Sequence, residues 1–157
     1  MPAAGQTGEH GRGMGWMTER TFVDTNVWVY AVDEADPAKR ARAAALLQPL
    51  ADSDFVVSTQ VLIEFYVVVT RKLAIPLTGE AAQAMVDEMA RLPVVPTDSQ
   101  LVLAAMAGSR EWGISLWDAL IIRAAEVSGC NLVLSENLKH GGTYGSVRVE
   151  NPFIVGT

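Results

Sequence analysis

The chain has 157 residues, a length that suits one domain with a buried core. Half of its residues are hydrophobic and 19% are charged, which is typical of a globular protein. The formal net charge of −6 opposes nonspecific attraction to nucleic acid or to an anionic membrane, although metal ions, a local basic patch or a basic partner can offset it. The single cysteine, Cys130, excludes an internal disulfide, so we expect a cytoplasmic location.

No segment has the pattern of a signal peptide or of a membrane span. The longest mostly apolar run, 61–69, is too short to cross a bilayer and contains Glu64. We therefore expect no membrane partner. Residues 1–19 are rich in glycine, and we expect a disordered N-terminal extension there, with Met14 and Met17 as alternative starts, followed by one domain over 20–157.

Strand and helix patterns alternate along that domain. Strands are predicted at 21–23, 55–57, 93–96, 132–134 and 147–149, and helices at 27–32, 37–48, 58–74, 78–92, 97–111 and 115–128. Thr97 and Gln100 form a predicted capping box, and Asp98 beside them is explained by capping alone. Such alternation implies parallel pairing with right-handed crossovers. The predicted fold class is therefore α/β, a single three-layer domain with a central parallel sheet flanked by helices.

Asp24 lies where the first strand ends, with Thr25 and Asn26 after it. In an open α/β sheet, ligands collect at the carboxyl ends of the strands, so this carboxylate can begin a metal site. Capping of the next helix is the competing explanation.

Glu64 and Asp118 lie in strongly apolar helical segments, 61–69 and 114–122. Carboxylates are rarely buried unless they are paired or bind a metal, and no cation lies three or four positions from either one. Glu64 has the alternative of pointing outward from an amphipathic helix. Asp118 has the alternative of forming a capping box with Ser115.

The three acids can share one site, because right-handed crossovers bring such positions to one edge of a parallel sheet. Gathered carboxylates repel each other, and Mg²⁺ or Mn²⁺ suits all-oxygen ligation. His10 and His140 lie far from these motifs in the sequence, and we expect both to be solvent-exposed.

The ordered motifs resemble the PIN-domain ribonucleases over about residues 20–153. Three segments carry the likeness: 23–26 (VDTN), Glu64 in the helix after the second strand, and 117–121 (WDALI). The segments 134–138 (LSENL) and 151–153 (NPF) look like the closing segments of the toxin branch, the proteins similar to virulence-associated protein C.

This resemblance implies an acidic Mg²⁺ or Mn²⁺ site that hydrolyses RNA. Asp24, Glu64 and Asp118 match the catalytic, metal-binding acids of the family, while Asn26 and Ser115 match supporting polar residues. The toxin branch implies a toxin–antitoxin pair with a cognate antitoxin as partner, and frequent homodimers.

One position departs from the family pattern. The fourth acid that the family often has falls at Asn137, which brings an oxygen ligand but no charge. Glu136 can replace it if the turn directs its side chain inward. The number of ions is therefore open, and a catalytically impaired PIN-like RNA-binding domain is the alternative function. A phosphatase with an aspartyl nucleophile is less favoured, because Asn26 stands where many such enzymes have a second aspartate.

RNA must approach an acidic protein, so a local basic surface is expected. The candidates are Lys39, Arg40, Arg42, Arg71, Lys72, Arg123 and Lys139. An ordinary solvated surface is the competing explanation for most of them.

Overall fold

The computed structural model describes residues 19–154. Residues 1–18, which hold most of the predicted extension and His10, lie outside the described residues. Within the described part, one six-stranded sheet has the order β3-β2-β1-β4-β6-β5. Its strands are β1 (Thr21–Val23), β2 (Phe55–Ser58), β3 (Val94–Val95), β4 (Leu132–Leu134), β5 (Thr143–Tyr144) and β6 (Val147–Glu150).

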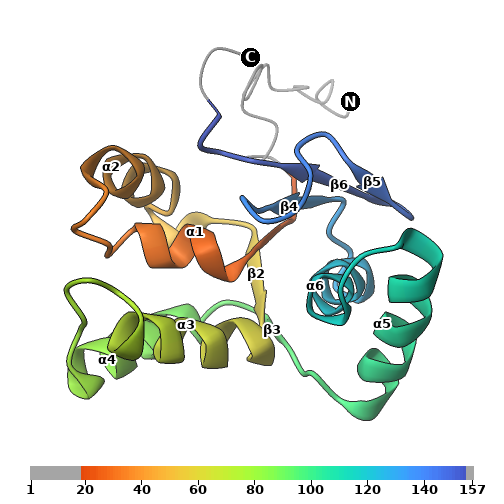
Figure 1. Cartoon of the computed structure of the whole chain (residues 1–157), viewed down its shortest axis with the longest axis horizontal. Coiled ribbons are helices and arrows are strands. Elements are labelled where there is room, and N and C mark those ends of the chain that lie inside the picture. Colours follow the sequence, from red (N-terminus) through yellow and green to blue (C-terminus); the bar gives the residue numbers. More distant parts are fainter. Residues whose placement is uncertain (1–18, 155–157) are drawn as a thin grey trace, which may run out of the picture.

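Every neighbouring pair of strands is parallel except β5 and β6, which pair antiparallel. The helices are α1 (Thr25–Tyr30), α2 (Pro37–Leu46), α3 (Thr59–Arg71), α4 (Gly79–Met89), α5 (Ser99–Trp112) and α6 (Leu116–Val127), with a 3-10 turn, η2, at Leu50–Asp52. Helices α1 to α4 lie on one side of the sheet and α5 and α6 on the other (Figure 1). The predicted three-layer α/β fold is confirmed. No helix within residues 19–154 is both long and apolar enough to cross a membrane.

Strand β1 is where the strand order reverses. The chain runs from β1 through β2 to β3 on one side, and β4 and β6 extend the sheet on the other. Open α/β sheets bind their ligands at the carboxyl end of such a reversal. Asp24, which directly follows Val23, therefore stands at the position that the topology favours for a site.

The central strands are buried on both faces. β1, β2 and β4 are buried at every residue, as expected for parallel strands covered by helices on both sides. Trp28 of α1 is only 2% exposed, and its indole Nε1 donates a hydrogen bond to the Val23 carbonyl at 3.1 Å. This bond fixes α1 against the end of β1, next to Asp24.

Two predicted helix starts are wrong, for the same reason: an aspartate caps the helix at another position. α1 begins at Thr25 rather than Val27, because Asp24 caps it. α5 is capped by Asp98, whose carboxylate accepts from the Leu101 amide at 2.9 Å. The predicted box of Thr97 and Gln100 does not form, since the Thr97 amide donates instead to Thr59 of α3.

A third difference is β5, which the sequence patterns do not predict. It is two residues long and lies in a glycine-rich segment, too short for a period-two pattern. Gly145 has φ +60 and turns the chain into β6.

Ser58 offers a test of how the sheet holds α3, the helix that carries Glu64. Its buried hydroxyl accepts from the Val61 amide at 3.3 Å and caps the helix. Ser58→Ala is expected to lower the free energy of unfolding by about 1 kcal/mol, measured by urea denaturation. Thr78→Ala removes the corresponding cap of α4 at an exposed position and is expected to lower the free energy of unfolding by a similar amount, about 1 kcal/mol. An unchanged stability for Ser58→Ala would contradict the capping role.

Candidate functional site

Asp24 is a buried carboxylate held by three donors. It is 4% exposed, and its amide donates to the Leu134 carbonyl, which continues the pairing of β1 with β4. Its Oδ1 accepts from the Thr25 amide at 2.7 Å. Its Oδ2 accepts from the Ser135 hydroxyl at 2.7 Å and from the Asn26 amide at 3.2 Å. Asp24 therefore caps α1 as the competing explanation requires, but the bonds to Oδ2 fix the carboxylate beyond what a cap needs.

Glu64 is directed toward the same sheet edge. Its Oε2 accepts from the Thr25 hydroxyl at 3.0 Å, and its Oε1 accepts from the Gln60 side-chain amide at 2.8 Å. The same Gln60 amide also reaches the Trp117 carbonyl at 3.4 Å, which links α3 to the start of α6. The alternative that Glu64 points outward is wrong, because both its oxygens are bound by neighbouring groups.

Asp118 lies in the first turn of α6. Its amide donates to the hydroxyl of Ser115, the N-cap of that helix, at 3.1 Å. Its side chain is half-buried, and burial raises the pKa of this carboxyl above its usual value, with Glu64 raising it further and Ser115 opposing the rise. The capping pair of Ser115 and Asp118 therefore exists. In this position the Asp118 carboxylate is also close enough to Glu64 for the charge of Glu64 to affect its pKa.

The three acids act on one another electrostatically. Burial raises the pKa of Asp24 to about 6; hydrogen bonds from Ser135 and Thr25 oppose the rise, and the charges of Glu64 and Asp118 add to it. None of the ion pairs within residues 19–154 includes any of these three carboxylates. The sheet edge therefore carries negative charge that no side-chain cation there offsets.

As the side chains stand, no three histidine, cysteine or acidic residues in the described part are close enough to hold a metal ion together. The chemistry of the acids nevertheless fits a hard divalent cation, because all available donors are oxygens and the charge of Glu64 raises the pKa of both Asp24 and Asp118. Asp24, Glu64 and Asp118 are the residues that would hold it.

Glu136 and Asn137, the weaker metal candidates, follow Ser135 in the turn after β4. The Glu136 carboxylate pairs with Lys39 at 2.6 Å and accepts from the Tyr30 hydroxyl at 2.6 Å. Its amide donates to the Asn26 side chain. The Asn137 amide donates to the Ser135 hydroxyl at 3.1 Å. The turn therefore supports the Asp24 partners Asn26 and Ser135, while the Glu136 carboxylate is engaged elsewhere.

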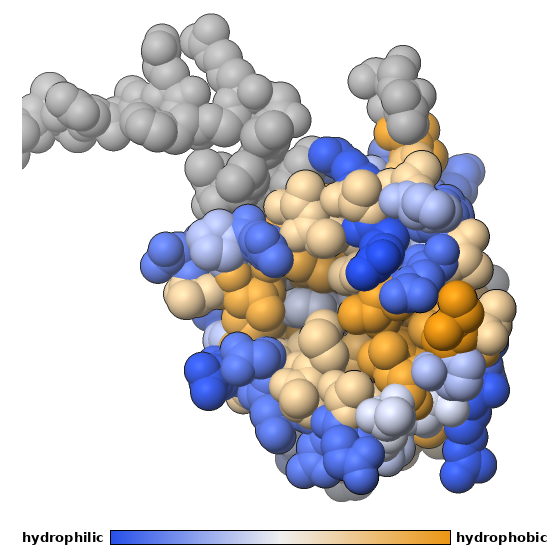
Figure 2. All heavy atoms as spheres, turned by 90° about the vertical axis from the view of Figure 1, so that its left-hand side faces the viewer, coloured by the Kyte–Doolittle hydropathy of each residue, from blue (hydrophilic) through white to orange (hydrophobic). Residues whose placement is uncertain are grey.

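A hollow of about 280 Å³ lies beside Glu64 and the two residues that follow Asp24. It is lined by Thr25, Asn26, Val29, Tyr30, Asp33, Glu64, Val68, Glu136 and Asn137. On the side of the molecule that α1 to α4 form, apolar side chains gather in the middle and hydrophilic ones surround them (Figure 2). The charged residues of this lining are all acidic, and Val29 and Val68 are among its apolar residues.

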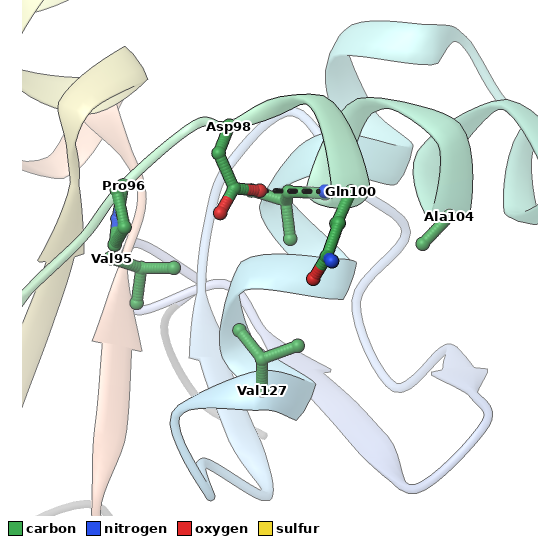
Figure 3. Close-up of a pocket in the computed structure, with 7 residues that line it drawn as sticks. Val95, Pro96, Asp98, Gln100, Ala104 and Val127 are labelled. Atoms are coloured by element: carbon green, nitrogen blue, oxygen red, sulfur yellow. Dashed lines mark hydrogen bonds between the residues drawn. The ribbon is translucent and has the colours of Figure 1, made fainter.

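A second hollow, of about 380 Å³, lies between the start of α5 and the end of α6. Asp98 and Gln100 are its polar lining residues, and Val95, Pro96, Ala104 and Val127 surround them (Figure 3). The Asp98 carboxylate is occupied as the α5 cap. We therefore place the site at the acids and not at this larger hollow.

Three residues that contact the acids are not among the site residues predicted from the sequence: Thr25, Gln60 and Ser135. Gln60 precedes Glu64 by one helical turn, which is a detectable signal. Thr25 and Ser135 read as ordinary residues of a helix start and of a turn, and only the pairing of β1 with β4 brings Ser135 to Asp24. The expected exposure of His140 is confirmed; its Nδ1 accepts from the Asn151 amide.

The family model of the PIN domain matches residues 21–141, which include all three acids and the supporting turn. The chain belongs to the PIN domain family. The resemblance seen in the sequence motifs is thereby confirmed at family level. No curated protein matches this PIN-domain chain.

Solved structures of toxin–antitoxin systems share the fold. The Rickettsia felis VapBC2 complex bound to promoter DNA matches with a TM-score of 0.56 and 19% identity, covering 83% of this chain and 97% of that chain. A toxin–antitoxin complex from Klebsiella pneumoniae matches with a TM-score of 0.60 and 15% identity, covering 86% and 99%. VapC20 of Mycobacterium tuberculosis, described as a toxin that cleaves the sarcin–ricin loop, matches with a TM-score of 0.53 and 21% identity, covering 72% and 86%. At these identities the likeness shows the fold.

The raised pKa of Asp24 predicts a pH effect on stability. The folded state binds the Asp24 proton more tightly than the unfolded state, so this group favours folding at low pH and loses that contribution as pH rises through about 6. As pH rises from 4 to 8, the parent is expected to lose about 3 kcal/mol of unfolding free energy relative to Asp24→Asn, which has no carboxyl group to titrate at this position. Urea denaturation across this range, without divalent ions, measures it. Asp98→Asn, at an exposed helix cap, is the control, and parallel curves for Asp24→Asn and the parent would contradict the raised pKa.

Proposed function

We propose that this PIN-domain chain is a metal-dependent endoribonuclease that hydrolyses RNA phosphodiester bonds. One observation carries the proposal. Three acidic side chains, Asp24, Glu64 and Asp118, lie at the carboxyl edge of the sheet and influence one another's charge, and no side-chain cation of the described part pairs with them. Burying an unpaired carboxylate costs free energy. Acidic groups perturbed in this way are found most often at functional sites.

Mg²⁺ or Mn²⁺ held by these acids would supply Lewis-acid stabilisation of the phosphate and a water of lowered pKa. The chain's own residues orient the ligands. Ser135 and Asn26 fix the Oδ2 atom of Asp24, and Thr25 donates to both Asp24 and Glu64, through its amide and its hydroxyl respectively. We assign Asp24 and Asp118 as direct ligands, and Glu64 as a ligand or as the acceptor of the water's proton.

We further propose that the protein is the toxin of a toxin–antitoxin pair that acts in the cytoplasm, with an antitoxin and a second copy of itself as partners. The neighbouring structures described as toxin–antitoxin complexes support this. Exposed apolar side chains on α3, namely Ile63, Tyr66 and Val67, also favour a protein partner.

A catalytically impaired RNA-binding domain is the second candidate. Its support is specific: Asn137 brings no charge, and the neighbouring Glu136 carboxylate is paired with Lys39. RNA binding without metal-dependent turnover would favour it.

Cleavage of a mixed cellular RNA pool tests the proposal. Purified protein is expected to cleave with Mn²⁺ and to stop with EDTA. Asp24→Ala and Asp118→Ala are each expected to abolish cleavage while the fold is retained, because each removes a metal ligand. Asp98→Asn, at a helix cap outside the site, should cleave like the parent. Full activity in either alanine variant would refute the assignment.

Ser135→Ala probes the supporting turn. It removes the 2.7 Å hydrogen bond to Asp24 and leaves the ligands in place. Mn²⁺ affinity is expected to fall about 10- to 100-fold, as for other partners that orient metal ligands. Calorimetric titration with Mn²⁺ measures this. Unchanged affinity would show that the turn does not orient Asp24.

A further inference from the structure

The hollow beside Glu64 has no cation among its described lining residues to receive a phosphate. Its charged lining residues, Asp33, Glu64 and Glu136, are all acidic. RNA carries a phosphate at every nucleotide, so a cationic side chain near the acids would strengthen its binding beyond what a metal supplies. The following inference rests on the proposed nuclease function.

Lys39 of α2 places a cation against this lining, through its ion pair with Glu136. Its Nζ lies 2.6 Å from Glu136 Oε2 and 3.3 Å from the Tyr30 hydroxyl. It also lies 4.6 Å from the centre of the Tyr30 ring and 5.7 Å from that of Phe153. The two rings pack edge to face at 4.9 Å. The ammonium therefore has aromatic contacts at the rim in addition to its ion pair with Glu136.

Glu136 is anchored differently. Its backbone amide is tied to the Asn26 side chain at 3.0 Å, whereas its carboxylate is held by the ends of the Lys39 and Tyr30 side chains. Rotation of the Glu136 side chain would free Lys39 while leaving the turn, and with it Ser135, in place.

We propose that Lys39 is a phosphate-binding residue of this site, and that Glu136 occupies it in the free protein and gives way to an RNA phosphate. The Glu136 carboxylate supplies the same charge and oxygen acceptors that a phosphate would supply. The acid that precedes Asn137 thereby screens the cation until substrate arrives.

The exchange is energetically accessible. The Lys39 and Glu136 side chains are 34% and 26% exposed, so the pair is partly hydrated at the rim. Ion pairs with such access to water contribute only about 0–1 kcal/mol. A phosphate held by both a metal and Lys39 would exceed that contribution, whereas an isolated anion would meet the repulsion of Asp33 and Glu64.

The competing explanation is that the pair only braces α2 against the turn. A third possibility is that Glu136 merely repels RNA. The three explanations differ in how substitutions at the two positions combine.

Binding of a short, fluorescein-labelled, mixed-sequence RNA, measured by fluorescence anisotropy with Ca²⁺ in place of Mg²⁺, separates them. The three acids stay unchanged in all variants so that the metal site is retained, and gel electrophoresis after each titration checks that the RNA is intact. Lys39→Met removes the charge and keeps most of the length of the side chain. It is expected to weaken binding about 5-fold and to reduce the salt slope by about 0.7, the loss of one phosphate contact. Glu136→Gln, which still accepts from Tyr30, is expected to tighten binding about 2- to 5-fold.

The matched control is Glu126→Gln. It removes the same charge from the Arg123–Glu126 pair, whose side chains are 21% and 23% exposed. It is expected to leave RNA affinity nearly unchanged. Thermal unfolding of every variant checks the fold.

The decisive comparison is Glu136→Gln in the presence and absence of Lys39. The proposal predicts a larger gain in affinity when Lys39 is present. A gain that is equal or larger in the Lys39→Met background overturns it, because Glu136 then only repels RNA. Weaker binding by Glu136→Gln also overturns it, because the pair is then a brace. In both cases, metal-dependent cleavage of RNA by the parent would still support the nuclease proposal. A parent protein that neither binds nor cleaves RNA would overturn the nuclease proposal and the Lys39 proposal together.

Discussion

The structure depends on a constraint at the carboxyl end of β1. The strand order reverses there, and the chain places the carboxylate of Asp24 between the end of this buried strand and the start of α1. The Oδ1 atom of Asp24 accepts a hydrogen bond from the first amide of α1. Its Oδ2 atom accepts from the side chains of Ser135 and Asn26. These bonds hold a carboxylate where burial alone would favour its protonated form. The cost is explained if a cation occupies the site.

Much of this architecture is predictable from local patterns. The buried strands β1, β2 and β4 are short, mostly apolar runs, and each α-helix of the described part follows a Ser, Thr or Asp cap that the sequence displays. The exceptions are instructive. β5 is too short to show periodicity, and the choice between Thr97 and Asp98 as the α5 cap depends on a contact with Thr59 from another helix. Long-range contacts decide what local propensity leaves open.

The candidate site is only partly predictable, for the same reason. Asp24, Glu64 and Asp118 stand out because charges rarely occupy apolar segments without partners. Gln60 lies within one turn of Glu64, but Ser135 reaches Asp24 only through strand pairing across 111 positions. The direction of the Glu136 side chain depends on Lys39 from α2, and no spacing in the sequence encodes that contact.

The central claim is that the three acids converge on a divalent cation. Titration of the parent protein with Mn²⁺, followed by electron paramagnetic resonance of the free ion, tests it without any RNA. The account predicts saturable binding that Asp24→Asn and Asp118→Asn each weaken strongly, while Asp98→Asn binds like the parent. Equal Mn²⁺ binding by all four proteins, or none by the folded parent, would contradict it.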